Sequence, residues 1–203
     1  MRYEILRDVL IIVVTAAAVL SALIGGLVFF VLRSILIKDV SSEVNQKVDS
    51  ECRKLNGLSD IQLGVTYWIQ KSYDNAIKVT ERAIFQAQDV LSEDRLIFAK
   101  SNLGFYYAEK HKYALKQKQK PFWHWKQKAI ELTKVGFDRY SASTPDLQAP
   151  DWIDNYVFVR VVFAQTDSEK AEIIQLIDEL LPRGDLEAVR RYLEQSKEYI
   201  SKN

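Results

Sequence analysis

The residues most able to bind a ligand gather in one basic and aromatic stretch, residues 109–128, with the sequence EKHKYALKQKQKPFWHWKQK. It carries seven lysines against one glutamate, with aromatic rings between them. Lysines beside tryptophans are typical of an anionic membrane surface, because ammonium groups meet lipid phosphates while indoles settle at headgroup depth. This interpretation selects four candidate lipid contacts, which are Lys116, Lys118, Lys120 and Trp123.

Two other interpretations of residues 109–128 stay open. Lysines can also neutralise nucleic-acid phosphates while rings stack on bases, but no recognised DNA- or RNA-binding motif accompanies them, so nucleic acid is the disfavoured partner. Alternatively the stretch is a solvated insertion, and the rings belong to the core stripe of the next helix, formed by Phe122, Trp125, Ala129 and Leu132.

The other reactive side chains form no catalytic pattern. His111 and His124 lack the spacing that places two metal ligands on one helical face. Cys52 is the single cysteine, which excludes an intrachain disulfide, a redox pair and a multi-cysteine zinc site. A glycine-rich phosphate loop and a nucleophile turn are also missing from the sequence. We therefore expect a protein that is not an enzyme and that uses no cofactor or metal ion.

The charges balance over the whole chain but not along it. There are 28 basic and 27 acidic residues in 203, which excludes a highly charged nucleic-acid binder as a description of the whole chain. Residues 108–140 carry nine basic and three acidic groups, whereas residues 141–203 carry seven and twelve. With 48% hydrophobic residues, the chain has enough apolar side chains for a packed core.

Residues 9–32 predict a transmembrane helix after a short tail, residues 1–8. The whole segment between Asp8 and Arg33 carries no charge. At about 1.5 Å per residue it spans a hydrocarbon core of roughly 30 Å, and it exceeds the apolar stretch of a cleaved signal peptide. Two rows of small residues would let a second copy pack closely, namely Ala17, Ser21, Gly25 and Ala18, Ala22, Gly26.

The flanking charges do not decide the orientation of this predicted span. Arg2 and Arg7 precede it, and Arg33, Lys38 and Lys47 follow it, so the numbers are similar on both sides. The absence of a glycosylation sequon and the lone thiol slightly favour a domain on the cytoplasmic side.

The rest of the chain predicts an all-α fold, because apolar residues recur at helical spacing and no proline precedes Pro121. A juxtamembrane helix is expected over 33–57, ended by Asn56-Gly57, with an apolar stripe at Val40, Val44, Val48, Cys52 and Leu55. Further helices are expected over 60–71, 72–90, 93–110, 121–138, 151–164, 168–181 and 185–200, with a proline-containing loop over 141–151.

Two segments repeat one another. LGVTYWIQKSY at 63–73 and LGFYYAEKHKY at 103–113 share Leu-Gly, a tyrosine three residues after the glycine, and a second tyrosine six residues later. This pattern resembles the tetratricopeptide repeat family, whose unit is two antiparallel helices. In the first copy Gly64 faces small residues at Ala76 and Ala83. In the second copy Ala129 and Gly136 supply those positions after a 13-residue insertion.

The resemblance covers residues 58–140 and implies a degenerate third pair and a capping helix within 152–203. In this family the first helix of each pair lines a concave groove, which implies six partner contacts here: Val65, Trp68, Ile69, Ser101, Phe105 and Glu109. The expected function is that of a membrane-anchored adaptor that binds a helix or peptide of another protein. The alternatives are a dimeric membrane signalling or structural protein with a helical stalk, and a domain that docks on an anionic membrane.

Overall fold

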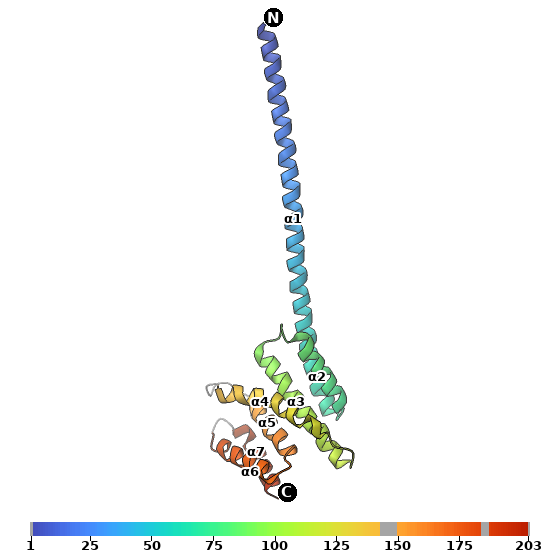
Figure 1. Ribbon diagram of the computed structural model, residues 1–203, viewed down its shortest axis with the longest axis vertical. Coiled ribbons are helices and arrows are strands. Elements are labelled where there is room, and N and C mark those ends of the chain that lie inside the picture. The colour runs from blue at the N-terminus through green and yellow to red at the C-terminus, as the bar shows by residue number, and fades with distance from the viewer. Residues whose placement is uncertain (1, 143–149, 184–186, 203) are drawn as a thin grey trace. The chain divides into compact units, whose positions relative to one another are not determined.

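The computed structural model describes residues 2–142, 150–183 and 187–202, without the side chains of residues 2–19, 22–23, 141–142, 150 and 188 (Figure 1). The described residues are helical and contain no strand, which confirms the predicted all-α class. The chain divides into two compact units, residues 1–51 and 52–203, and each is described by itself.

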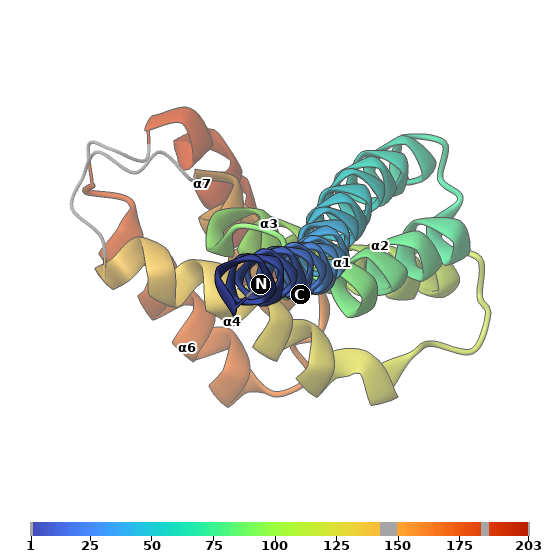
Figure 2. The same cartoon turned by 90° about the horizontal axis from the view of Figure 1, so that it is seen from above.

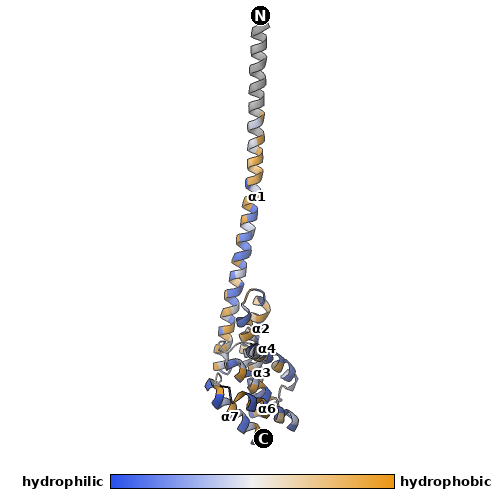
Figure 3. Cartoon of the chain, turned by 90° about the vertical axis from the view of Figure 1, so that its left-hand side faces the viewer, coloured by the Kyte–Doolittle hydropathy of each residue, from blue (hydrophilic) through white to orange (hydrophobic). Residues whose placement is uncertain are grey.

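The first unit is built from helix α1 (Arg2–Ile69), which continues into the second unit. Large apolar side chains are exposed along this unit between Leu20 and Ile37. Figure 3, which colours the ribbon by residue hydropathy, shows a hydrophobic band on α1 below its grey end. Within the described residues, no helix meets the length and hydrophobicity needed to cross a membrane. The side chains of residues 9–19, 22 and 23, which belong to the predicted span, lie outside the described ones.

Helix α1 passes through Asn56-Gly57 without a break, so the predicted helix end at this point is wrong. The glycine serves helix packing instead of helix termination. A Cβ atom at Gly57 would lie 2.6 Å from the Cβ of Ala87 on the neighbouring helix. The two helices can approach this closely only because glycine has no side chain.

The second unit consists of consecutive helices that pack on one another. They are the end of α1, α2 (Tyr73–Ala87), α3 (Glu93–Lys116), a short 3-10 turn η1 (Trp123–Trp125), α4 (Lys126–Ala142), α5 (Pro150–Val162), α6 (Asp167–Leu180) and α7 (Glu187–Lys202). Helix α3 also packs on α5, and α7 packs on both α5 and α6 (Figure 1, Figure 2). Of the predicted loop over 141–151, residues 143–149 lie outside the described residues.

Two predicted helix limits need correction. Helix α3 continues to Lys116 instead of ending near Lys110, because its Lys- and Gln-rich end holds no helix-breaking residue. The helix expected to begin at Pro121 instead begins at Lys126, after the turn η1.

The first two helix pairs are held by the same glycine contact. A Cβ at Gly64 of α1 would clash with the Thr80 hydroxyl and lie 3.6 Å from the Ala76 carbonyl oxygen of α2. A Cβ at Gly104 of α3 would lie 2.7 Å from two atoms of α4, the Ala129 carbonyl oxygen and the Thr133 methyl carbon. Relative to the glycine, the alanine and threonine stand at +12 and +16 in the first pair and at +25 and +29 in the second. The 13-residue insertion therefore lies between the glycine and the alanine of the second pair.

Part of this insertion lengthens α3. Lys71 (φ 59°) and Lys118 (φ 55°) each end a helix in the left-handed conformation, and in both turns the next residue donates its N–H to a carbonyl five residues back. Lys71 stands at +7 from Gly64, whereas Lys118 stands at +14 from Gly104. Seven inserted residues therefore add two turns to α3, and the other six lengthen the connection to α4.

The second tyrosine of the repeated pattern is not equivalent in the two copies. Tyr73 begins α2, whereas Tyr113 still belongs to the lengthened α3. The two rings contact each other, with centroids 5.7 Å apart. The insertion thus places Tyr113 beside the first copy rather than at the matching position of the second.

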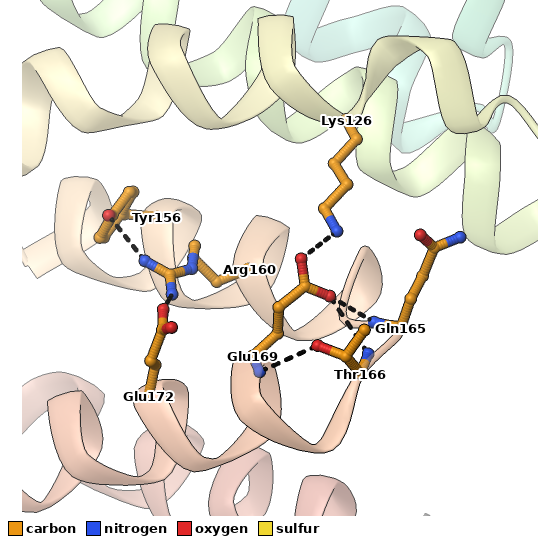
Figure 4. Close-up of polar contacts among 7 residues, drawn as sticks. All are labelled: Lys126, Tyr156, Arg160, Gln165, Thr166, Glu169 and Glu172. Atoms are coloured by element: carbon orange, nitrogen blue, oxygen red, sulfur yellow. Dashed lines mark hydrogen bonds and ion pairs between the residues drawn. The ribbon is translucent and has the colours of Figure 1, made fainter.

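Polar contacts connect α4, α5 and α6 (Figure 4). Thr166 and Glu169 form a capping box at the start of α6, and Lys126 of α4 forms an ion pair with the same Glu169. The hydrogen bond from Lys126, followed by the backbone N–H of Gln165, lowers the pKa of Glu169 to about 2. The N-cap of α6 is thus Thr166, two residues before the Ser168 start that the sequence predicts.

Candidate binding groove

Three aromatic rings form a row across helices α1, α3 and α5. Trp68 of α1 meets Phe105 of α3 with ring centroids 5.4 Å apart, and Phe105 meets Phe158 of α5 at 4.9 Å. Phe158 is buried, whereas Trp68 and Phe105 are only partly buried. The row therefore keeps part of its apolar surface available to another molecule.

A cleft of about 320 Å³ adjoins Phe158 at one end of this row. Its walls come from the end of α3, the second half of α5 and helix α7, and most of the lining residues are apolar. Leu115 and Tyr199 are well exposed on it. The full lining is Lys112, Leu115, Phe158, Val161, Val162, Tyr192, Gln195, Ser196 and Tyr199. We name the aromatic row and this cleft together the groove.

The predicted partner contacts are only partly brought together. Trp68 and Phe105 lie in the row, Val65 is half-buried on α1, and Ile69 is 68% exposed. Ser101 is fully buried and accepts a hydrogen bond of 3.1 Å from the Asn155 side chain of α5. Ser101 is therefore a contact between two helices of the same chain, not a surface for a partner.

The last predicted contact, Glu109, lies half-buried on α3 among polar neighbours. Its carboxylate accepts a hydrogen bond from the Tyr73 hydroxyl at 3.4 Å and lies 3.8 Å from the Lys112 ammonium. That ammonium also lies 4.7 Å from the centroid of the Phe158 ring. Lys112 thus sits between a carboxylate and an aromatic face, and it compensates the charge of Glu109.

The sequence did not reveal the contributions of α5 and α7. Phe158, Val161 and Val162 belong to a helix without the Leu-Gly pattern, and Tyr192 and Tyr199 belong to the last helix, which was expected only to cap the domain. The helical spacing of residues 154, 158 and 161 was a usable signal, since it places them on one face of α5.

Asp154 belongs to that face of α5 and lies one turn before Phe158. Its Oδ1 atom is buried without a hydrogen-bond partner in the described part of the chain. Burial, followed by the nearby Asp151 carboxylate, raises the pKa of Asp154 to about 7. Burial and then the charge of Asp154 raise the pKa of Tyr192, whose hydroxyl hydrogen-bonds with Ser196.

The lysines of the basic stretch fall into two groups. Four of them form ion pairs with carboxylates of the same chain: Lys110 with Asp74, Lys112 with Glu109, Lys126 with Glu169, and Lys128 with Glu81. The three predicted lipid contacts Lys116, Lys118 and Lys120 are exposed and have no ion pair among the described residues. The uncompensated positive charge is therefore concentrated at the end of α3 and the turn after it.

The aromatic rings of the stretch pack on the domain. Trp123, the fourth predicted lipid contact, lies against His111 and Phe163, with ring centroids 4.4 and 6.2 Å away. Phe122 stacks on Trp125 at 4.4 Å with an interplanar angle of 10°. The partly buried indole of Trp123 is thus a packing group, and the lysines beside it are the part of the stretch that faces solvent.

The two histidines occupy different environments. His111 is fully buried, its Nδ1 accepts the Phe122 N–H at 3.1 Å, and burial lowers its pKa. His124 is exposed. Among the residues that the structure describes, no cluster of His, Cys, Asp or Glu side chains has the arrangement needed for a metal ion.

Comparison with known proteins identified no relative of this chain. The chain matches no family model, no curated protein and no solved structure.

Proposed function

We propose that this protein is a membrane-anchored adaptor whose helical domain holds a helix or peptide of another protein in the groove. The observation that carries the proposal is the row of Trp68, Phe105 and Phe158 next to an apolar cleft. Aromatic side chains with a rigid backing are the usual anchors of protein interfaces, and an apolar groove suits the apolar face of a partner segment.

The repeated helix pairs support a relationship to tetratricopeptide repeats. Gly64 and Gly104 each allow the next helix to approach at an alanine and a threonine. Such an arrangement aligns the first helices of successive pairs, which is why residues of α1, α3 and α5 meet in one row. The proposed partner site follows from this alignment.

The proposed anchor is the uncharged segment 9–32, which is long enough for a transmembrane helix. We place the helical domain on the cytoplasmic side, on the arguments of the lone thiol and the absent glycosylation sequon. An adaptor of this kind would hold its partner at a membrane surface.

Site-specific photo-crosslinking tests the groove. We would replace Phe105 with the photoreactive residue p-benzoylphenylalanine in cells, and make the same replacement at Phe85 as a control, since Phe85 is 80% exposed on α2 and lines no part of the groove. The expected result is a discrete adduct from position 105 only, which weakens when Phe158→Ala is added. Equal adducts from both positions, or an adduct from position 85 alone, would refute the groove as the partner site.

A second candidate function, docking on an anionic membrane, is favoured by the exposed and unpaired Lys116, Lys118 and Lys120. A chain without residues 1–33 should then sediment with vesicles containing phosphatidylserine and not with phosphatidylcholine vesicles. Added salt should weaken this binding, because the Debye length is only about 10 Å at 0.1 M.

Matched charge changes test the location of this docking surface. Replacement of Lys116, Lys118 and Lys120 by Gln should release the protein from anionic vesicles. The same three-charge change at Lys78, Lys134 and Lys202, on α2, α4 and α7, should leave it bound. Equal loss in both triple variants would mean that general charge, not this surface, holds the protein on lipid.

A further inference from the structure

Beside the groove, close to Tyr192 of its lining, lies one carboxylate whose charge no described residue compensates. Asp154 lies on the face of α5 that carries Phe158 and Val161, because residues 154, 158 and 161 follow helical spacing. Its Oδ1 atom is buried, and Asp154 makes no hydrogen bond or ion pair within the described part of the chain. A carboxylate in this position is costly to ionise.

The groups near Asp154 do not neutralise its carboxylate charge. On α5 its charged neighbour is Asp151, one turn away and of the same sign. On α7 the facing group is the Tyr192 hydroxyl, which is neutral at physiological pH. On α3 the charges of Glu109 and Lys112 compensate each other at 3.8 Å. Among the described residues of all the helices packed on α5, no cation forms an ion pair with Asp154.

The charge of Asp154 discriminates between classes of partner. An acidic segment would bring a like charge to a partly buried carboxylate. A wholly apolar segment would cover the carboxylate and remove it from water without a partner, which is unfavourable. A segment with one cationic side chain would supply a charge-assisted hydrogen bond at the same moment as its apolar residues fill the cleft.

We propose that the segment held in the groove is apolar with a Lys or Arg side chain that pairs with Asp154. This inference rests on the proposed function of the groove and names the chemistry of the partner. The chain itself contains a similar arrangement at the groove, where the Lys112 ammonium lies between the Glu109 carboxylate and the Phe158 ring. A partner's cation beside Asp154 would meet a similar combination of carboxylate and aromatic rings.

Peptide binding to the full chain in phosphatidylcholine nanodiscs tests the inference. The probes are three fluorescent amphipathic peptides of equal length with the same leucine positions and with Lys, Gln or Glu at every polar position, and empty nanodiscs serve as the blank. We expect the Lys peptide to bind most tightly. Asp154→Asn should weaken its binding by about tenfold or more, as expected for loss of one charge-assisted pair. Glu131→Gln on α4, the same charge change at an exposed site, should have no effect.

The pH dependence of binding provides a second readout. Ionisation of Asp154 increases as the pH rises from 6 to 8, so the Lys peptide should bind more tightly at pH 8 than at pH 6 in the wild-type protein. In Asp154→Asn this difference should disappear, while the Gln peptide should show little pH dependence in either protein. Circular dichroism would show that the variant keeps its fold.

The outcomes separate this inference from the proposed function. If the Glu peptide binds as tightly as the Lys peptide, or if Asp154→Asn binds the Lys peptide like the wild type, the inference is overturned. The groove itself still stands in that case, provided that Phe105→Ala weakens binding. If none of the peptides binds and Phe105→Ala changes nothing, both the proposed function and the inference fail.

Discussion

At the scale of single residues, a polar group of three joins α2, α3 and α4. The Tyr107 ring is 2% exposed, and its hydroxyl donates a hydrogen bond of 2.5 Å to Glu81 and accepts one of 2.7 Å from Lys128. Burial, followed by the hydrogen bond to Glu81, raises the pKa of Tyr107 to about 12. The hydroxyl therefore stays protonated and keeps donating to Glu81 over the physiological pH range.

Tyr107→Phe tests the contribution of this hydroxyl. We expect the free energy of unfolding to fall by about 1–2 kcal/mol, because two hydrogen bonds to charged groups are lost while the ring remains. Urea unfolding followed by circular dichroism measures the change. Tyr106→Phe is the matched control, since Tyr106 is equally buried and its hydroxyl makes no hydrogen bond among the described residues. Equal effects of the two substitutions would contradict the role of the polar group.

Asp154→Asn should make stability depend less on pH. The folded-state pKa of Asp154 is raised from 3.8 to about 7, so the fold favours the protonated form, and this contribution is lost as the pH rises through that range. At pH 8 the variant should be more stable than the wild type by about 1–3 kcal/mol, because it removes a buried, uncompensated charge. Near pH 4 the two proteins should be similar. Thermal unfolding at both pH values provides the measurement, and a destabilised variant at pH 8 would show that Asp154 has a partner.

At the scale of helices, the sequence predicts more of the packing than of the helix lengths. The glycine contacts were predictable, because Gly64 and Gly104 recur with small residues at matching distances once the 13-residue insertion is set aside. The length of α3 was not predictable, because Lys and Gln continue a helix as readily as they form a solvated loop. The end of α1 was missed for a related reason, because Gly57 looks like a helix stop until the neighbouring helix is known.

The same contrast holds for the groove. The resemblance placed Trp68 and Phe105 on the facing first helices, and the two rings do meet. It also selected Ser101, which tertiary packing buries against Asn155. The walls from α5 and α7 depend on how α5 packs on α3 and how α7 packs on α5, and no local pattern in their sequences specifies that arrangement.

Gly104→Ala tests the close approach of α3 and α4. The new methyl group would lie 2.7 Å from the Ala129 carbonyl oxygen, and this backbone atom cannot move away without shifting α4. We expect a loss of about 1–3 kcal/mol in the free energy of unfolding, despite the higher helix propensity of alanine. The control is Gly25→Ala in the first unit, where an added Cβ would meet no atom within 4 Å. An unchanged or raised stability of Gly104→Ala would argue against the close contact between these two helices.

At the scale of the whole molecule, removal of residues 1–33 should leave a soluble helical protein. The helices of residues 52–203 have their own buried core, and the longest run of exposed apolar residues lies before residue 38. Circular dichroism of the truncated chain should be dominated by helix, and the protein should stay in solution without detergent. A spectrum dominated by strand, or a continued need for detergent, would contradict this architecture.

The geometry of the apolar stripe after the predicted span bears on whether two chains pair there. Val40, Val44 and Val48 are each about half exposed, so no described residue covers them. Their spacing of four residues shifts the stripe by about 40° per step around a helix of 3.6 residues per turn, whereas a left-handed coiled coil requires an average spacing of 3.5. Two parallel chains would therefore not keep such a stripe in contact as a left-handed coiled coil, which is the usual geometry of a dimeric helical stalk. A long left-handed dimeric stalk is therefore not the arrangement that we expect.

Crosslinking through Cys52 checks this expectation, because the single thiol is exposed. A short-arm bismaleimide should produce no symmetric dimer of the full chain in micelles, while a monofunctional maleimide should label Cys52 and so demonstrate that the thiol is accessible. Efficient crosslinking at low protein concentration would instead favour the dimeric signalling or structural alternative. The contacts to test next would then be the small-residue rows of the predicted span and a right-handed pairing along the stripe.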